Sequence, residues 1–86
     1  MTSPFLREGR VVWPDGSPAV GALIAIASGT APTPEIAIRC DQEGRFRIAL
    51  PEGWFRIEAR APDGATGGIE VAGSEGGEIK IVVAPT

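Results

Sequence analysis

The chain has 86 residues, enough for one domain with a small core, and its formal net charge is −3 at pH 7. This acidic balance argues against general binding to nucleic acids or anionic membranes, which needs a basic surface. The sequence has no histidine and one cysteine, Cys40, so we expect no disulfide, no catalytic residues, no cofactor and no metal site.

Alternation of apolar and polar residues, the period of a half-buried strand, recurs along the chain. It predicts strands at 5–13 and 20–28, and a short third strand that Ile36 and Ile38 open and that ends near Cys40. Further strands are predicted around 46–50, 55–59, 69–71 and 79–83, separated by turn sequences such as PDG (14–16 and 62–64), DQEG (41–44) and GSEGG (73–77). The pattern predicts an all-β fold, a seven-stranded antiparallel β-sandwich that forms a single domain over residues 1–86.

The triplet Phe-Arg-Ile occurs twice, at 46–48 and 55–57. In each copy the Phe and Ile share one strand face, so we expect them in the core and the central arginine in solvent. The two copies are predicted to face each other in one hairpin centred near Pro51, with Arg47 close to opposite Arg56.

This hairpin predicts a basic stripe on an acidic protein. Its members are Arg45, Arg47, Arg56 and Arg60. Like charges that lie directly opposite in a sheet are destabilising, and arginine suits planar contacts with carboxylates, so the stripe is a candidate docking surface for an acidic protein. The alternative is an ordinary solvated face in which Glu58 offsets the arginines, or a two-residue register shift that pairs Arg47 with Glu58.

Exposed apolar groups form a second set of candidates. Trp54 points outward if Phe55 points inward, and it either contacts a partner or folds over the end of the hairpin. Leu23 and its outward neighbours Ala25 and Ala27 lack the usual polar alternation, as do Val82 and Ala84 in the last strand. They indicate a partner or subunit interface, unless the loop at 29–35 covers the second strand.

Other distinctive residues have structural explanations. Trp13, at a strand end, is expected to plug one end of the sandwich, with a ligand contact as the alternative. Cys40 is expected to be a small buried hydrophobe. Asp15, Asp41 and other acidic turn residues suit turn hydrogen bonding better than a Ca²⁺ site, which needs six or more converging oxygens.

Two stretches resemble the signatures of carboxypeptidase regulatory-like domains. The first, GRVVWPDGSPAVGALIAI, starts at Gly9, and the second, RCDQEGRFRIALPEGWFRIEARAPDG, starts at Arg39; the resemblance covers residues 9–83. The matching positions are Gly9, Val11, Gly16, Pro18, Gly21, Ala22, Ile24, Ile26, Asp41, Gly44, Phe46, Leu50, Gly53 and Phe55. Cys40 stands where the family usually has Thr or Ser. The resemblance implies a prealbumin-like sandwich with an Ig-like Greek key and a non-catalytic accessory or binding role.

The leading functional prediction is a non-enzymatic protein-interaction module that docks a protein partner, with acidic partners favoured by the stripe, or that self-associates as a homo-oligomer. Its predicted contacts are Arg45, Arg47, Trp54, Arg56, Arg60 and Leu23. The alternatives are a carbohydrate-binding module that uses Trp54 or Trp13, and a spacer without a partner. The N-terminal MTSPFLREGR lacks a basic segment followed by a long apolar stretch, so we expect no secretory signal and a cytoplasmic location, unless the sequence is trimmed from a longer precursor.

Overall fold

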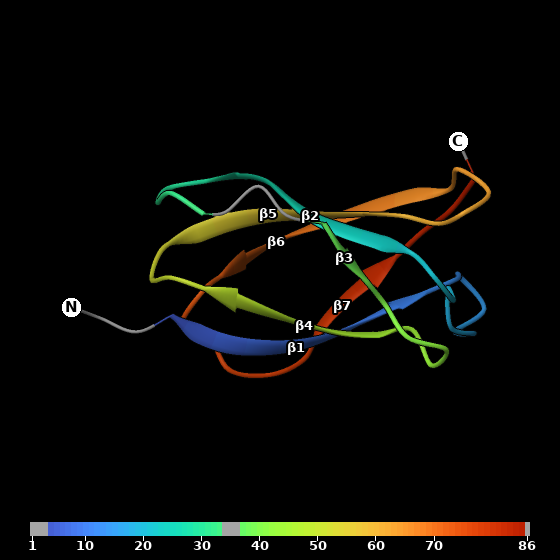
Figure 1. Ribbon diagram of the computed structural model, residues 1–86, viewed down its shortest axis with the longest axis horizontal. Coiled ribbons are helices and arrows are strands. Elements are labelled where there is room, and N and C mark those ends of the chain that lie inside the picture. The colour runs from blue at the N-terminus through green and yellow to red at the C-terminus, as the bar shows by residue number, and fades with distance from the viewer. Residues whose placement is uncertain (1–3, 34–36, 86) are drawn as a thin grey trace.

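A computed structural model describes residues 4–33 and 37–85, so Ile36 of the predicted third strand lies outside the described residues. Seven strands form two sheets that pack face to face (Figure 1), which confirms the all-β fold and the number of strands. The three-stranded sheet has the order β4-β1-β7 and the four-stranded sheet the order β3-β2-β5-β6. The strands are β1 (Phe5–Val12), β2 (Leu23–Gly29), β3 (Ile38–Arg39), β4 (Arg45–Leu50), β5 (Trp54–Arg60), β6 (Thr66–Ala72) and β7 (Ile79–Val82).

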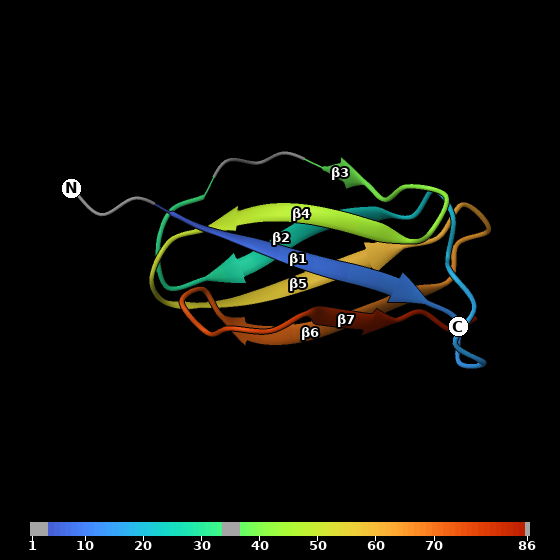
Figure 2. The same ribbon diagram turned by 90° about the horizontal axis from the view of Figure 1, so that it is seen from below.

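The sequence predicted a purely antiparallel sandwich, and this part of the prediction is wrong. The first and last strands run parallel, with Gly9 opposite Ile79 and Val12 opposite Val82, and Figure 2 shows their arrows pointing the same way. Alternation of apolar residues reports which face of a strand is buried but not its direction or its neighbours. The parallel pairing of strands about 70 residues apart was therefore invisible to the pattern.

The predicted hairpin of the two Phe-Arg-Ile triplets is also wrong. β4 pairs with β1, whereas β5 pairs with β2 and β6, so the two triplets lie in different sheets. The connection at 51–53 carries the chain from one sheet to the other, and Gly53 in it has φ of 136°, which favours glycine. Two strands that each have one apolar face can bury both faces by packing across the core, and here they do so instead of pairing edge to edge.

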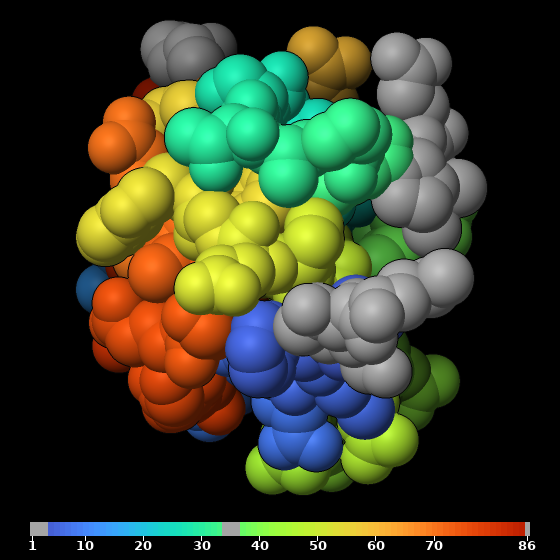
Figure 3. All heavy atoms as spheres, turned by 90° about the vertical axis from the view of Figure 1, so that its left-hand side faces the viewer, coloured from blue at the N-terminus to red at the C-terminus, as the bar shows by residue number. Residues whose placement is uncertain are grey.

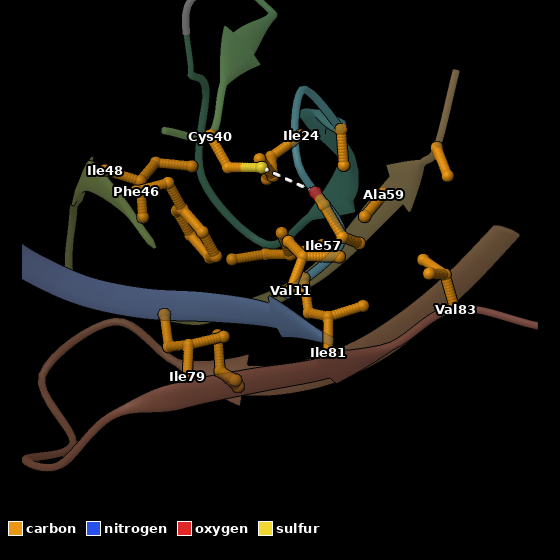
Figure 4. Packing of buried hydrophobic residues seen from close by; sticks show 14 of the residues in the cluster. Val11, Ile24, Cys40, Phe46, Ile48, Ile57, Ala59, Ile79, Ile81 and Val83 are labelled. Atoms are coloured by element: carbon orange, nitrogen blue, oxygen red, sulfur yellow. Dashed lines mark hydrogen bonds between the residues drawn. The ribbon is translucent and has the colours of Figure 1, made fainter. Parts of the chain in front are cut away.

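The core contains the inward residues of both sheets, as the alternation predicted. Phe46 and Ile48 are buried, as are Phe55 and Ile57, and the arginine at the centre of each triplet is exposed. Figure 4 shows apolar side chains from the two sheets meeting between the layers. Gly9 makes room for this packing, because a Cβ there would lie 2.2 Å from the ring of Phe46.

Three single residues complete the core. Cys40 is buried, as predicted, and its Sγ donates a hydrogen bond to the carbonyl oxygen of Ala19 at 3.0 Å. Trp13 is partly buried and packs against the core, in line with its predicted role as a plug. Arg7, in contrast, was not expected inside, yet it shares the inward parity of Val11 and is only 7% exposed.

The guanidinium of Arg7 holds the connection between β6 and β7. Nη1 donates to the carbonyl oxygens of Ala72 at 2.6 Å and Gly73 at 3.2 Å, and Nη2 donates to that of Gly77 at 3.2 Å. Within residues 4–33 and 37–85 these partners are all backbone carbonyls, and no carboxylate forms an ion pair with Arg7. A buried cation that satisfies its N–H groups in this way ties a loop near the end of the sequence to the first strand.

Candidate binding faces of the two sheets

The four predicted arginines do not form one stripe. Arg45 and Arg47 lie on the outer face of the three-stranded sheet, and Arg56 and Arg60 lie on the outer face of the four-stranded sheet. The core separates the two pairs, because their strands face each other across it rather than along a hairpin. The prediction that all four are exposed is correct, but the single basic surface is not.

Glutamates on the same faces offset three of these arginines. Arg47 Nε lies 3.4 Å from Glu8 Oε1, its neighbour across the β1–β4 ladder. Arg45 Nη1 lies 3.3 Å from an oxygen of Glu43, and Arg56 Nε lies 3.3 Å from Glu58 Oε2. These pairs are well exposed to solvent, and such pairs contribute only about 0–1 kcal/mol each. The alternative of a solvated face interleaved with glutamate therefore describes the local charge balance.

The outer face of the four-stranded sheet combines apolar and charged columns. Leu23, 39% exposed, lies opposite Arg60 on β5, and the exposed Ala25 lies opposite Glu58. Ala27 is also exposed, but it lies at a bulge in β2, and Ser28 takes the next position, opposite Arg56. The part of the 29–35 loop that the structure describes leaves this column exposed, and residues 34 and 35 lie outside the described residues.

The apolar residues of the last strand do not extend this face. Val82 is 46% exposed, but it belongs to β7 in the three-stranded sheet. Ala84 forms an isolated bridge with Thr66 of β6 at the margin between the two sheets. The candidate patch is therefore confined to Leu23, Ala25 and Ala27.

Trp54 begins β5 at one end of the same face and is 59% exposed, which confirms its predicted outward orientation. Its backbone N–H donates to the Thr30 hydroxyl at 2.9 Å, so the loop after β2 fixes the start of β5. A hollow of about 300 Å³ lies beside the indole, with Ser28, Arg56 and Glu70 among its lining residues. Figure 3 looks onto this end of the molecule, where the β4–β5 connection lies between the loop after β2 and the β6–β7 connection.

A row of three cations crosses the other sheet, and sequence reasoning missed it. Arg10 of β1 lies opposite Arg45 of β4 on one side and opposite Lys80 of β7 on the other. Arg10 Nε is buried without a hydrogen bond, and Glu78 Oε1 lies 3.6 Å away, close enough for an ion pair but not a hydrogen bond. The outward parity of Arg10 and Lys80 is readable from the sequence, but their adjacency depends on the unpredicted β1–β7 pairing.

The acidic turn residues serve the turns, as predicted. One carboxylate oxygen of Asp41 accepts hydrogen bonds from the N–H groups of Arg45 at 2.9 Å and Glu43 at 2.8 Å, and these bonds lower the pKa of Asp41. The hydroxyl and the N–H of Ser17 do the same for Asp15 and lower its pKa. Among the residues that the structure describes, no group of three or more acidic or thiol side chains is placed to hold a metal ion.

A scan of the sequence against protein-family models gave no match, and a search of curated proteins found no relative. No helix in the described ranges is long and apolar enough to cross a membrane.

Proposed function

We propose that this domain is a non-catalytic protein-interaction module, and that its docking face is the outer surface of the four-stranded sheet. The observation that carries the proposal is the exposure of Trp54 at one end of a face whose β2 column is apolar. Tryptophan and arginine dominate the binding energy of protein interfaces, usually within a ring of weaker contacts that excludes water.

The face holds both kinds of residue along β2 and β5, with Trp54 at one end and Arg60 opposite Leu23 at the other. Leu23 and the two exposed alanines of β2 form a shallow apolar strip, and Arg56 and Arg60 of the adjacent strand flank it. Arg60 has no ion pair within the described residues, so its guanidinium is available to a partner's carboxylate. Arg45 and Arg47, on the opposite side of the sandwich, are not part of this face.

The test is capture of partners by the tagged chain from lysate of its own source, followed by titration of the purified partner. We expect one protein near stoichiometric amount, and a Trp54→Ser variant that weakens its binding by about 30-fold, the effect of losing a 2 kcal/mol hot spot. Val20→Ser is the matched control, because Val20 is 51% exposed but lies in the turn before β2. Equal loss in both variants, or no loss in either, would exclude this face.

Self-association through the same face is the other form of the proposal. Sedimentation of the purified chain over a concentration series would then show a dimer that Trp54→Ser dissociates. A monomer at all concentrations, with no captured protein, would leave two alternatives: a spacer without a partner, or a carbohydrate-binding module.

A carbohydrate-binding module is the second candidate, and the hollow beside Trp54 favours it. An exposed aromatic ring next to hydroxyl, guanidinium and carboxylate groups can stack on a sugar and bind its hydroxyls. Trp13 packs against the core, so we assign this role to Trp54 alone. A Trp13→Phe variant leaves Trp54 as the only indole, and its fluorescence should shift on titration with the right polysaccharide. An unchanged spectrum across a broad panel would count against glycan binding.

The family assignment also remains a proposal. The arrangement of three and four strands in two sheets supports the resemblance to carboxypeptidase regulatory-like domains, with their prealbumin-like sandwich. The assignment requires that the family's topology include a parallel pair of the first and last strands, as β1 and β7 form here. An accessory role without catalysis agrees with a sequence that has no histidine.

A further inference from the structure

The outer edge of β4 carries backbone groups that the sheet does not use. The N–H of Val11 donates to the carbonyl oxygen of Gly44, so Val11 directs its backbone groups toward β4. Backbone direction alternates along an antiparallel pair, and in the β1–β4 register Arg45, Arg47 and Ala49 then point theirs away from β1. The turn confirms this at Arg45, whose N–H and C=O bond to Asp41.

Beyond Arg45, no strand of the described residues pairs with this edge. β3 precedes β4 in the chain, but it pairs with β2 in the other sheet and does not continue along β4. In this register no strand faces the N–H and C=O groups of Arg47 and Ala49, no other backbone hydrogen bond among the described residues involves them, and both residues are exposed. An edge of this kind is a template for an added strand.

The surroundings of this edge favour an acidic strand. A hollow of about 540 Å³ lies beside it, and its lining is charged: three arginines (Arg39 of β3 with Arg45 and Arg47 of β4) and three carboxylates (Glu8, Asp41 and Glu78) contribute to it. The row of Arg45, Arg10 and Lys80 continues the positive charge across the outer face of the sheet. The ion pairs of Arg45 and Arg47 with Glu43 and Glu8 are about two-thirds exposed, at 64%/67% and 70%/69%, so these guanidinium groups can exchange partners at small cost.

We propose that the edge of β4 binds an extended acidic segment of another protein as an added antiparallel strand. The segment's backbone pairs with Arg47 and Ala49, and its acidic side chains lie opposite Arg47 and beside the guanidinium of Arg45 on the outer face. A second copy of β4 is the poorer occupant, because it brings the arginines of both copies onto one face. This surface is separate from the Trp54 face, and the inference does not depend on the proposed function.

The test uses a fluorescein-labelled peptide, Thr-Val-Glu-Val-Glu-Val-Thr, and the intact chain. We expect saturable binding that weakens at 0.5 M NaCl, and much weaker binding of the same peptide with Lys in place of Glu. Backbone N-methylation on the pairing edge should also abolish binding. The double variant Arg45→Ser/Arg47→Ser should lose about 5- to 25-fold in affinity, up to about fivefold for each exposed pair. Arg56→Ser, on the opposite face, is the matched control.

Amide hydrogen exchange locates the added strand. The amides of Arg47 and Ala49 should exchange fast in the free chain and slow on peptide binding, whereas that of Ile48, which points toward β1, is slow in both states. Ala49→Pro removes one edge donor at a position where proline is tolerated, and it should abolish binding while circular dichroism shows the sandwich intact.

Several results would overturn the proposal. Equal binding of the Glu and Lys peptides would show that the arginines do not select an acidic segment. Equal losses of affinity in Arg56→Ser and the double variant would show that the peptide does not bind at the β4 edge. No binding up to 1 mM peptide would exclude the site. Protection of the Arg47 and Ala49 amides that rises with protein concentration alone would identify a second copy as the occupant. Trp54→Ser should leave peptide binding unchanged, so failure here is distinguishable from failure of the Trp54 face.

Discussion

Replacing Arg7 by methionine tests whether the buried guanidinium stabilises the fold. The substitution keeps an unbranched side chain of similar length but removes three hydrogen bonds to the carbonyl oxygens of Ala72, Gly73 and Gly77. A hydrogen bond to a charged group contributes about 1.5–3 kcal/mol, and burial of the cation opposes this by several kcal/mol. The carbonyls left without partners add about 1–3 kcal/mol each where water cannot reach them. We expect a net loss of about 2–4 kcal/mol.

This loss is large for a domain of 86 residues, whose total stability is about 4–13 kcal/mol at typical values per residue. Urea denaturation measures it directly: the midpoint should fall by about 2–4 M if the slope is about 1 kcal/mol per M. Arg47→Met is the matched control, because Arg47 is exposed and its one ion pair is weak, so its effect should stay below about 0.5 kcal/mol. If Arg7→Met is as stable as Arg47→Met, the three hydrogen bonds do not stabilise the fold and our reasoning is refuted.

Three further substitutions and treatments follow from the structure. Gly67→Ala should destabilise the fold by about 2–4 kcal/mol, because its Cβ would lie 2.0 Å from the carbonyl oxygen of Val82, whereas Gly76→Ala, where the space is open, should have little effect in the same thermal melts. Asp41→Asn should lower the urea midpoint at pH 7. The pKa of Asp41 in the folded chain lies below its ordinary value of 3.8. The ionised carboxylate therefore stabilises the fold above pH 3.8, and this contribution is lost as the pH falls through the folded pKa. A stability difference between variant and wild type that stays constant down to pH 2 would contradict this. The buried Cys40 should react slowly with a thiol reagent in the native chain and rapidly in 8 M urea, and equal rates in both would show that the thiol is not enclosed.

The sequence predicted those features of the fold that depend on one strand at a time. Period-two alternation correctly placed Phe46 and Ile48 inside and Arg47 outside, because each strand has one buried face. The turn sequences ended the strands close to where the structure ends them. Trp54 was assigned to the outside by the same parity argument, and it is exposed.

Features that depend on which strands are neighbours could not be predicted in this way. The hairpin prediction failed because two one-faced strands can pack across a core as well as beside each other, and alternation is the same in both cases. The prediction of a single basic stripe was wrong for the same reason, because it required the two strands to be neighbours in one hairpin. The cation row around Arg10 was missed because it requires the β1–β7 register. Arg7 was missed because an arginine at an inward position is normally read as a break in the pattern, and its carbonyl partners lie 65 to 70 residues away.

The parallel pairing of the first and last strands also determines how the domain responds to tension. Because β1 and β7 lie side by side and run in the same direction, the chain enters near one end of the long axis and leaves near the other (Figure 1). A force that pulls the two ends apart therefore acts along these strands, and it loads the hydrogen bonds between Gly9–Val12 and Ile79–Val82 together in shear. A hairpin pulled from its open end would release its bonds one after another. The domain should thus resist stretching between its two ends better than its modest thermodynamic stability suggests, since forced unfolding follows the unfolding rate rather than the equilibrium.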